Sequence, residues 1–460
     1  MSLLLRGAET GAGPADCRVH DGRVHALAPE LAPRRGERVI DARGGALLPG
    51  LTDHHIHLLA TAAAMDSVRL TPGADLATAV RAAPAPHGWV RVLGYDEIRH
   101  GDLDRDVLDA LEPARPVRVQ HRGGSLWVLN SAALRRLGLD AGPLPPGVEL
   151  DGGGRPTGRL WRADAVLRER LPLPPPDLSR LGAVLAAYGI TSVTDATPDL
   201  DEQGVAHITA AMARGDLPQR VTFLGAAAPP PQARRAALGP RKIVVPDHTL
   251  PSPDDLAAAI RAARAARRAV ALHCVTREAL ALIIAALTET GTVPGDRLEH
   301  CAVASPDALE FLARHDLRVI TQPSLPAARG DDYLARVDPE DLPDLWRYAG
   351  FLRAGVRVAP SSDAPYGGLD PWAAMAAARD RATPSGLVLG PAERVPARTV
   401  LDGALSHPLD PGGPPARLAV GAPADLVLLR VPLARALREP DSSLVALTVI
   451  EGRIAYEAAP

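Results

Sequence analysis

The chain is poor in several residue types whose absence restricts its class. Its 460 residues include only three cysteines, Cys17, Cys274 and Cys301, which are widely spaced and odd in number. This argues against a disulfide framework and against a cysteine-based zinc site. Apolar runs do not approach the 18 residues that a membrane-spanning helix needs. The net charge is −3 without a basic stripe, so we expect a cytoplasmic protein with neither nucleic acid nor membrane as partner.

Lysine is the scarcest basic residue. Of the 51 Lys and Arg residues, only Lys242 is a lysine, and Asn130 is the single asparagine. A G+C-rich coding sequence produces both depletions, so a lysine that survives can indicate a task that a guanidinium cannot fill. A buried ammonium can lose its proton, whereas arginine in practice cannot. Only a neutral amine reacts with carbon dioxide to form a carbamate, although chance survival is the plainer explanation.

A short apolar run ends in a pair of histidines. Residues 48–57 read LPGLTDHHIH, with His55 and His57 two positions apart. Successive side chains of a strand alternate between its faces, so these two imidazoles point the same way and can hold one metal ion. His54 then points to the opposite face. A histidine pair alone is more often a solvated strand face than a metal site.

Strand-like and helix-like segments alternate regularly from residue 190 onward. The strand-like runs are rich in Val, Ile and Leu, which is typical of parallel strands joined by crossover helices. Together with residues 51–57 they number eight, and this favours a (β/α)8 TIM barrel with its active site at the carboxyl ends of the strands. The predicted strands are 51–57, 190–195, 221–225, 242–245, 270–273, 297–300, 317–322 and 356–361.

The two ends of the chain differ from this pattern. Residues 1–50 and 402–460 contain short strands around Asp-Gly and Glu-Gly turns, which indicate hairpins. Neither end has enough strands for a stable sheet, so we expect both to form one small composite β-sandwich. The barrel would then span residues 51–401, with an insertion at about 66–180 that governs substrate specificity.

Metal-binding residue types end or follow several predicted barrel strands. His273 ends the fifth strand, His300 ends the sixth, and Asp363 follows the eighth, while Lys242 lies on the fourth. Each has a plainer reading by itself, as a satisfied polar group or a turn residue. Their order matters more, because the carboxyl ends of barrel strands meet on one face. The candidate set for one metal site is His55, His57, Lys242, His273, His300 and Asp363.

The longer motifs resemble those of the amidohydrolase superfamily, metal-dependent hydrolases built on a TIM barrel. The 48–57 string is similar to its first-strand signature, and GAPADLVLL at 421–429 to its closing strand. The strings at 151–158, 189–195, 296–300, 321–323 and 362–365 resemble its family 3 branch, which includes YtcJ-like proteins and N-substituted formamide deformylases. One departure is Ser125, which stands where that branch has a histidine, so the substrate or the efficiency is expected to differ.

The resemblance implies a binuclear zinc site and a hydrolytic reaction. It implies that carboxylated Lys242 bridges two Zn²⁺ ions and that metal-bound hydroxide attacks an amide-type carbonyl. Asp363 would move the proton to the leaving nitrogen. One ion would be held by His55, His57 and Asp363 and the other by His273 and His300. A single-ion site of His55, His57, His273 and Asp363 is the alternative.

The implied activity is hydrolysis of a non-peptide carbon–nitrogen bond in a small molecule. The alternatives are a non-catalytic metal-binding relative, indicated by Ser125, and a deaminase or C–O hydrolase of the same superfamily. A homodimer is one expected assembly, since dimers are common among relatives. The substrate itself is not indicated by any motif. The candidate substrate-binding residues are Tyr95, Ser125, Trp127 and Tyr366.

Overall fold

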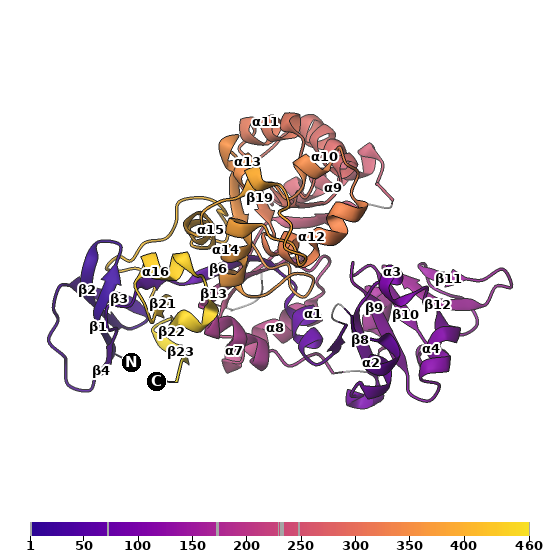
Figure 1. The fold of residues 1–460 in the computed structure, drawn as a ribbon, viewed down its shortest axis with the longest axis horizontal. Coiled ribbons are helices and arrows are strands. Elements are labelled where there is room, and N and C mark those ends of the chain that lie inside the picture. The colour runs from indigo at the N-terminus through magenta and orange to yellow at the C-terminus, as the bar shows by residue number, and fades with distance from the viewer. Residues whose placement is uncertain are drawn as a thin grey trace. The chain divides into compact units, whose positions relative to one another are not determined.

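The fold is mixed α/β and divides into two compact units. The computed structural model describes residues 2–70, 73–171, 174–228, 230, 234–246 and 249–459. One unit consists of Met1–Leu58 with Leu178–Pro460, and the other of Leu59–Asp177. Both contain helices and strands (Figure 1). None of the helices within the described ranges is both long and apolar enough to cross a membrane.

The larger unit contains two parallel sheets, and both include strands expected from the sequence. Their strand orders are β15-β14-β13-β6 and β16-β17-β18-β19-β20. All eight predicted strands are present, and β15 is an additional short one. The strands are β6 (Leu51–Ile56), β13 (Ile190–Asp195), β14 (Arg220–Phe223), β15 (Ala236–Leu238), β16 (Arg241–Val244), β17 (Val270–Cys274), β18 (Arg297–His300), β19 (Arg318–Thr321) and β20 (Arg357–Pro360).

Backbone hydrogen bonds connect the two parallel sheets. The N–H of Lys242 in β16 donates to the carbonyl of Leu224, which follows β14, at 3.1 Å. The N–H of Asp363, beyond β20, donates to the carbonyl of His55 in β6 at 2.9 Å. The second bond brings the carboxyl ends of β6 and β20 together, and these ends carry three of the predicted metal ligands.

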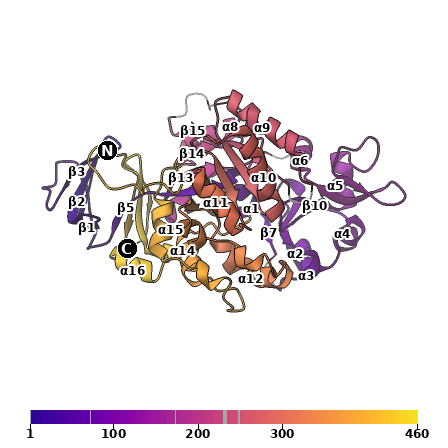
Figure 2. The same ribbon diagram turned by 90° about the horizontal axis from the view of Figure 1, so that it is seen from above.

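Helices follow most of these strands along the chain, and several of them are labelled in Figure 2. Several begin at an N-cap that the sequence supplies: Ser252 accepts a hydrogen bond from the N–H of Asp255 at 3.1 Å, and Thr276 and Ser305 cap α10 and α11 in the same way. The helices are α7 (Ser179–Ala187), α8 (Glu202–Arg214), α9 (Pro253–Ala265), α10 (Arg277–Thr290), α11 (Pro306–Arg314), α12 (Ser324–Arg336), α13 (Ala349–Arg353), α14 (Pro371–Asp380), α15 (Ala397–Ala404) and α16 (Leu433–Arg438).

Two four-stranded sheets contain the two ends of the chain. Their orders are β3-β2-β1-β4 and β23-β22-β21-β5. Strand β5, from the N-terminal segment, pairs antiparallel with β21, from the C-terminal segment. One hydrophobic core joins Leu3 and Leu5 to Leu426 and Leu447. The strands are β1 (Ser2–Thr10), β2 (Gly13–His20), β3 (Arg23–Ala28), β4 (Arg38–Asp41), β5 (Leu47–Pro49), β21 (Leu426–Leu429), β22 (Val445–Ile450) and β23 (Arg453–Glu457).

Both hairpins predicted from acidic-Gly pairs are confirmed. Asp21 and Gly22 connect β2 to β3 with φ of 48° and 74°, and Glu451 and Gly452 connect β22 to β23 with φ of 49° and 74°. Two successive residues with positive φ form the turn whose twist matches antiparallel strands. Glycine at the second position tolerates this backbone without strain.

A buried ion pair makes the terminal sheets sensitive to acid. Nε of Arg18 donates to the Glu37 carboxylate at 2.8 Å, and this bond lowers the pKa of Glu37 from 4.5 to about 2. The stability that this pair contributes is present above pH 4.5 and is lost as the pH falls toward 2. Thermal unfolding of Glu37→Gln and the unchanged protein, followed from pH 7 to pH 3, should therefore show a difference that shrinks as the pH falls. A difference independent of pH would contradict this.

The smaller unit contains one six-stranded sheet of order β11-β12-β10-β9-β8-β7. One hydrophobic core forms around Val92 and Val119, and another forms around Trp127 and Leu129. Two cores are expected because successive side chains of a strand point to opposite faces of the sheet. Its elements are α1 (Leu58–Met65), which begins at the unit boundary, β7 (Val68–Arg69), α2 (Leu76–Ala82), β8 (Val90–Tyr95), α3 (Glu97–His100), α4 (Arg105–Leu111), β9 (Val117–His121), β10 (Leu126–Leu129), α5 (Ser131–Leu137), β11 (Val148–Leu150), β12 (Pro156–Trp161) and α6 (Asp164–Arg170).

Candidate metal centre

Three of the predicted metal ligands meet at the carboxyl ends of β6 and β20. The Nε2 atoms of His55 and His57 lie 3.4 Å and 3.3 Å from Oδ1 of Asp363. One ligand atom from each of these residues can be chosen so that all three lie within 4.8 Å of one another. His55 and His57 thus point to the same side, as their spacing predicts. The arrangement suits a single ion between two imidazoles and a carboxylate.

Two further histidines continue this group across neighbouring strands. Nδ1 of His300 lies 3.9 Å from Oδ2 of Asp363. The ring of His300 lies 4.8 Å from that of His55 and 4.7 Å from that of His273, measured between centroids. The structure therefore brings both predicted histidines of β17 and β18 into the cluster.

Lys242 enters the same region from β16. In the register of β16 and β17, Lys242 pairs with Ala271, two residues before His273. Its side chain is buried, and its Nζ makes no hydrogen bond with the described residues. Burial lowers the pKa of this ammonium against the opposing charges of Glu299 and Asp363. The lone lysine is thus held where its charged form is disfavoured by desolvation.

Burial disfavours the charged form of three histidines of the cluster. It lowers the pKa of His55 to about 3, assisted by the charge of Lys242. Burial likewise lowers the pKa values of His273 and His300. Burial alone would raise the pKa of Asp363, but its interactions with the neighbouring imidazoles of His300, His57 and His55 outweigh it and hold that pKa below its usual range. An imidazole binds a metal ion in its neutral form, and a carboxylate binds one in its ionised form.

Buried atoms without hydrogen bonds test whether the cluster fits a metal ion. Among the described residues these atoms include Nε2 of His55, Oδ1 of Asp363 and Nζ of Lys242. Leaving a buried polar atom without a partner costs about 1–3 kcal/mol, so three in one place call for an explanation. Nitrogen and oxygen ligands of this kind are those that Zn²⁺ takes. The residues fit a divalent metal ion at this place.

Three buried side chains that support the cluster were missed in the sequence. Asp53 accepts a hydrogen bond from the N–H of Ser362 at 3.0 Å and so fixes the chain before Asp363. Glu299 contacts Nδ1 of His55. Gln322 and Glu299 lie within motifs that carried the family resemblance, at 321–323 and 296–300, but no spacing rule assigned them a partner.

Gln322 has a defined orientation beside His300. Its Nε2 donates to Oγ of Ser361 at 2.9 Å, so its Oε1 faces Nδ1 of His300, also at 2.9 Å. An amide oxygen can only accept, so Nδ1 of His300 carries the proton. The lone pair of His300 is therefore on Nε2.

Strained backbone conformations occur at the same strand ends. His300, Cys301 and Asp363 have φ of 71°, 50° and 52°, which non-glycine residues adopt rarely. Such conformations cost of the order of 1–3 kcal/mol each and concentrate at functional sites. The strain is consistent with selection for the placement of these side chains.

The predicted substrate-binding residues fall in both units. Tyr366 follows Asp363, and its ring lies 5.6 Å from that of His57. Tyr95, Ser125 and Trp127 belong to the smaller unit. Tyr95 donates from its hydroxyl to the carbonyl of Gly101 at 2.8 Å, and the indole N–H of Trp127 donates to Asp164 at 3.0 Å. The carbonyl of Ser125 accepts from the N–H of Arg162 at 2.7 Å.

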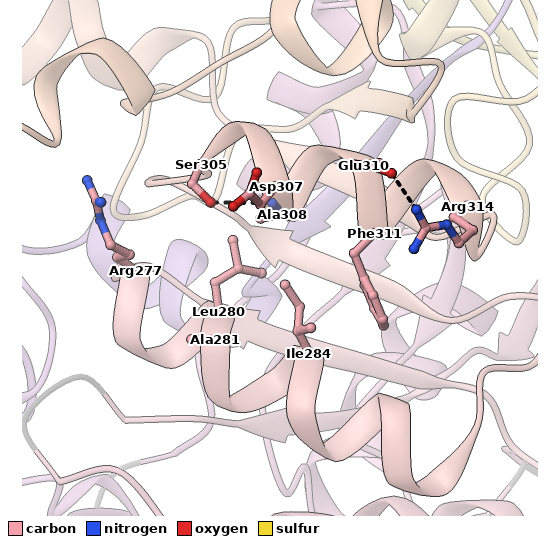
Figure 3. A pocket seen from close by; sticks show the side chains of 10 residues that line it. All are labelled: Arg277, Leu280, Ala281, Ile284, Ser305, Asp307, Ala308, Glu310, Phe311 and Arg314. Atoms are coloured by element: carbon pink, nitrogen blue, oxygen red, sulfur yellow. Dashed lines mark hydrogen bonds and ion pairs between the residues drawn. The ribbon is translucent and has the colours of Figure 1, made fainter.

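A separate groove lies between α10 and α11. It has a volume of about 390 Å³ and an apolar lining that includes Leu280, Ile284 and Phe311 (Figure 3). None of the predicted site residues lines it. Arg314 at its rim pairs with Glu310 on the same helix. The groove contains none of the convergent metal-binding groups seen at the strand ends.

Comparison with known proteins supplies the family. The sequence model of the amidohydrolase family matches residues 38–456. The chain belongs to this family. The N-substituted formamide deformylase of Arthrobacter pascens is 27% identical to this chain in sequence. The alignment covers 95% of this chain and 94% of the deformylase. The resemblance drawn from the sequence motifs is thereby confirmed.

Two further similarities are partial or structural. The adenine deaminase of Deinococcus radiodurans is 32% identical over 160 residues, which are 33% of this chain and only 24% of the deaminase. The crystal structure of an uncharacterized metal-dependent hydrolase from Pyrococcus horikoshii OT3 superposes with a TM-score of 0.71 at 20% identity, covering 99% of this chain and 100% of the other. The second similarity establishes that the fold is shared.

Proposed function

We propose that this amidohydrolase cleaves a non-peptide carbon–nitrogen bond of a small molecule with a divalent metal ion bound at the strand ends. The observation that carries the proposal is the convergence of His55, His57 and Asp363, in which Nε2 of His55 and Oδ1 of Asp363 are buried and make no hydrogen bond with the described residues. The similarity to the formamide deformylase over nearly the whole chain supports the type of bond.

The proposal includes a barrel architecture. We infer that the two parallel sheets close into a (β/α)8 barrel of residues 51–401 with an insertion at about 66–180. The bonds from Lys242 to Leu224 and from Asp363 to His55 support closure on both sides. Residues 1–50 and 402–460 would form the composite β-sandwich, and their common hydrophobic core supports this.

The proposed metal centre uses all six predicted residues. Bound zinc would supply a water of lowered pKa and polarise the scissile carbonyl. Lys242, as a carbamate, would help to hold two ions, and its buried amine, which makes no hydrogen bond with the described residues, supports this role. His55, His57 and Asp363 would hold one ion, and His273 and His300 the second.

Asp363 is proposed to move the proton during hydrolysis. Its carboxylate is buried beside two imidazoles, and its lowered pKa keeps it ionised at neutral pH. It can therefore accept the proton of the attacking water and deliver it to the leaving nitrogen. Tyr366, close to His57, is proposed to contact the substrate, with Tyr95, Ser125 and Trp127 of the smaller unit as further candidates.

Deamination is a second candidate function. The partial similarity to an adenine deaminase favours it, because deamination also breaks a carbon–nitrogen bond by hydrolysis. The two activities differ in their products: a deaminase releases ammonia, whereas an amide-type hydrolase forms a carboxylate and an amine. Assays of both products with formamides, acylated amino acids, cyclic amides and aminopurines distinguish them.

Removal of the metal tests the proposal directly. Protein treated with a chelator, and shown by elemental analysis to be metal-free, should lose hydrolysis of its substrate, because the attacking water would no longer be activated. Addition of zinc should restore the activity. Full activity in verified metal-free protein would contradict the proposal. A protein that binds zinc but hydrolyses no compound in the substrate screens would favour a non-catalytic relative.

A further inference from the structure

Glu299 links a permanent cation to the first metal-binding histidine. It is fully buried on β18, between Arg297 on the same strand and His55 on β6. Its Oε1 accepts a hydrogen bond from Nε of Arg297 at 2.6 Å, and its Oε2 contacts Nδ1 of His55. One carboxylate therefore serves two donors, with one oxygen for each.

The position of the proton on His55 follows from this contact. Its ion pair with Arg297, whose guanidinium stays charged, keeps the Glu299 carboxylate ionised, so the side chain is an acceptor only. A neutral imidazole facing it must carry its proton on Nδ1. The lone pair is then on Nε2, the atom that faces Asp363.

We propose that Glu299 is a positioning residue that holds His55 in the Nδ1–H tautomer and thereby keeps Nε2 able to bind a metal ion. The consequence for metal binding rests on the proposed function, whereas the tautomer itself does not. Carboxylates that accept from a metal-binding histidine fix its tautomer and ring orientation in many metal sites.

Substitution by glutamine gives a specific expectation because of Arg297. Glutamine has a single carbonyl oxygen, and Arg297 can only donate. The amide of a Glu299→Gln variant should therefore turn its oxygen to Arg297 and its NH₂ group to Nδ1 of His55. Nδ1 would become the acceptor, and the proton would move to Nε2, where it opposes metal binding.

The test is a long-range ¹H–¹⁵N NMR spectrum of zinc-free, ¹⁵N-histidine-labelled protein, with the His55 signals assigned by their loss in His55→Asn. We expect His55 to be protonated on Nδ1 in the unchanged protein and on Nε2 in Glu299→Gln. Zinc titration should show a dissociation constant raised about ten- to hundredfold in the variant. An Nε2–H tautomer in the unchanged protein, or an unchanged tautomer or zinc affinity in Glu299→Gln, would overturn the proposal.

The matched control is Asp296→Asn, at the residue that directly precedes β18, at the opposite end of the strand from Glu299. Asp296 is equally buried and pairs with Arg264, with 2.8 Å between Nη1 and Oδ1, so its loss should lower stability. The tautomer and the zinc affinity should stay unchanged. If Glu299→Gln fails to fold, Glu299→Asp keeps the charge beside Arg297 but withdraws it from His55, and zinc affinity should still fall. An inverted tautomer in a protein that binds no zinc would support the role of Glu299 while refuting the proposed function.

Discussion

Replacement of Asp363 by asparagine is expected to reduce kcat by a factor of about 10²–10⁴, the usual contribution of a positioned acid–base group. Asparagine has nearly the same shape, and the N–H of residue 363 can still donate to the carbonyl of His55. The fold should therefore persist. An amide, however, can neither accept the proton of the attacking water nor deliver one to the leaving nitrogen.

The measurement needs to separate loss of proton transfer from loss of metal. Zinc content and kcat of Asp363→Asn should be determined on the same preparation and compared at equal occupancy. Asp380→Asn is a suitable control, because this aspartate lies at the end of α14 and pairs with the exposed Arg379. Undiminished kcat in zinc-loaded Asp363→Asn would show that another group moves the proton.

Replacement of Lys242 is expected to change the metal stoichiometry. Protein purified without chelator should contain about two zinc equivalents, and Lys242→Ala about one, because the carbamate that would bridge two ions is lost. Activity should fall with the second ion. Lys242→Arg should behave like the alanine variant although it retains the charge, since a guanidinium does not form a carbamate.

The single lysine also allows the carbamate to be observed directly. After incubation with ¹³C-enriched bicarbonate, a carbamate resonance assigned to lysine can arise only from Lys242. The signal should be absent in Lys242→Arg. One zinc equivalent regardless of residue 242 would instead indicate a mononuclear site and favour deaminase-type chemistry.

Strand positions and the order of the candidate metal ligands were predictable because both leave local patterns. Apolar runs between helix-length segments located eight of the nine strands in the two parallel sheets, and His55 and His57 share a face as their spacing requires. The short strand β15 was missed because its three residues, Ala236–Leu238, carry little apolar pattern. A histidine or acid at a strand end could be recognised as a candidate, but its neighbours could not.

Glu299 shows why the supporting residues escaped prediction. Its partner His55 is 244 positions away in the chain, so no spacing connects them. Regular alternation would also place Glu299 and His300 on opposite faces. His300 instead has a φ of 71°, which ends the regular strand and lets both residues approach the cluster. Backbone strain of this kind is not visible in composition or periodicity.

Aromatic residues in the smaller unit illustrate another limit. Trp127 and Tyr95 are candidate substrate contacts, but in a chain with few aromatic residues they can equally be core anchors. Both are buried in the hydrophobic cores of the smaller unit, and both donate a hydrogen bond within that unit. A scarce aromatic residue has the same sequence signature whether it fills a core or faces a ligand.

The pairing of β5 with β21 has a consequence for how the protein is made. Leu47 lies opposite Leu428, so an early strand obtains its partner only after several hundred further residues have been synthesised. Such a distant contact is slow to form and leaves an unpaired strand edge during translation. Ribosome-bound chains that stop before β21 should therefore depend on chaperones, and premature termination in the last strands should yield aggregating rather than merely inactive products.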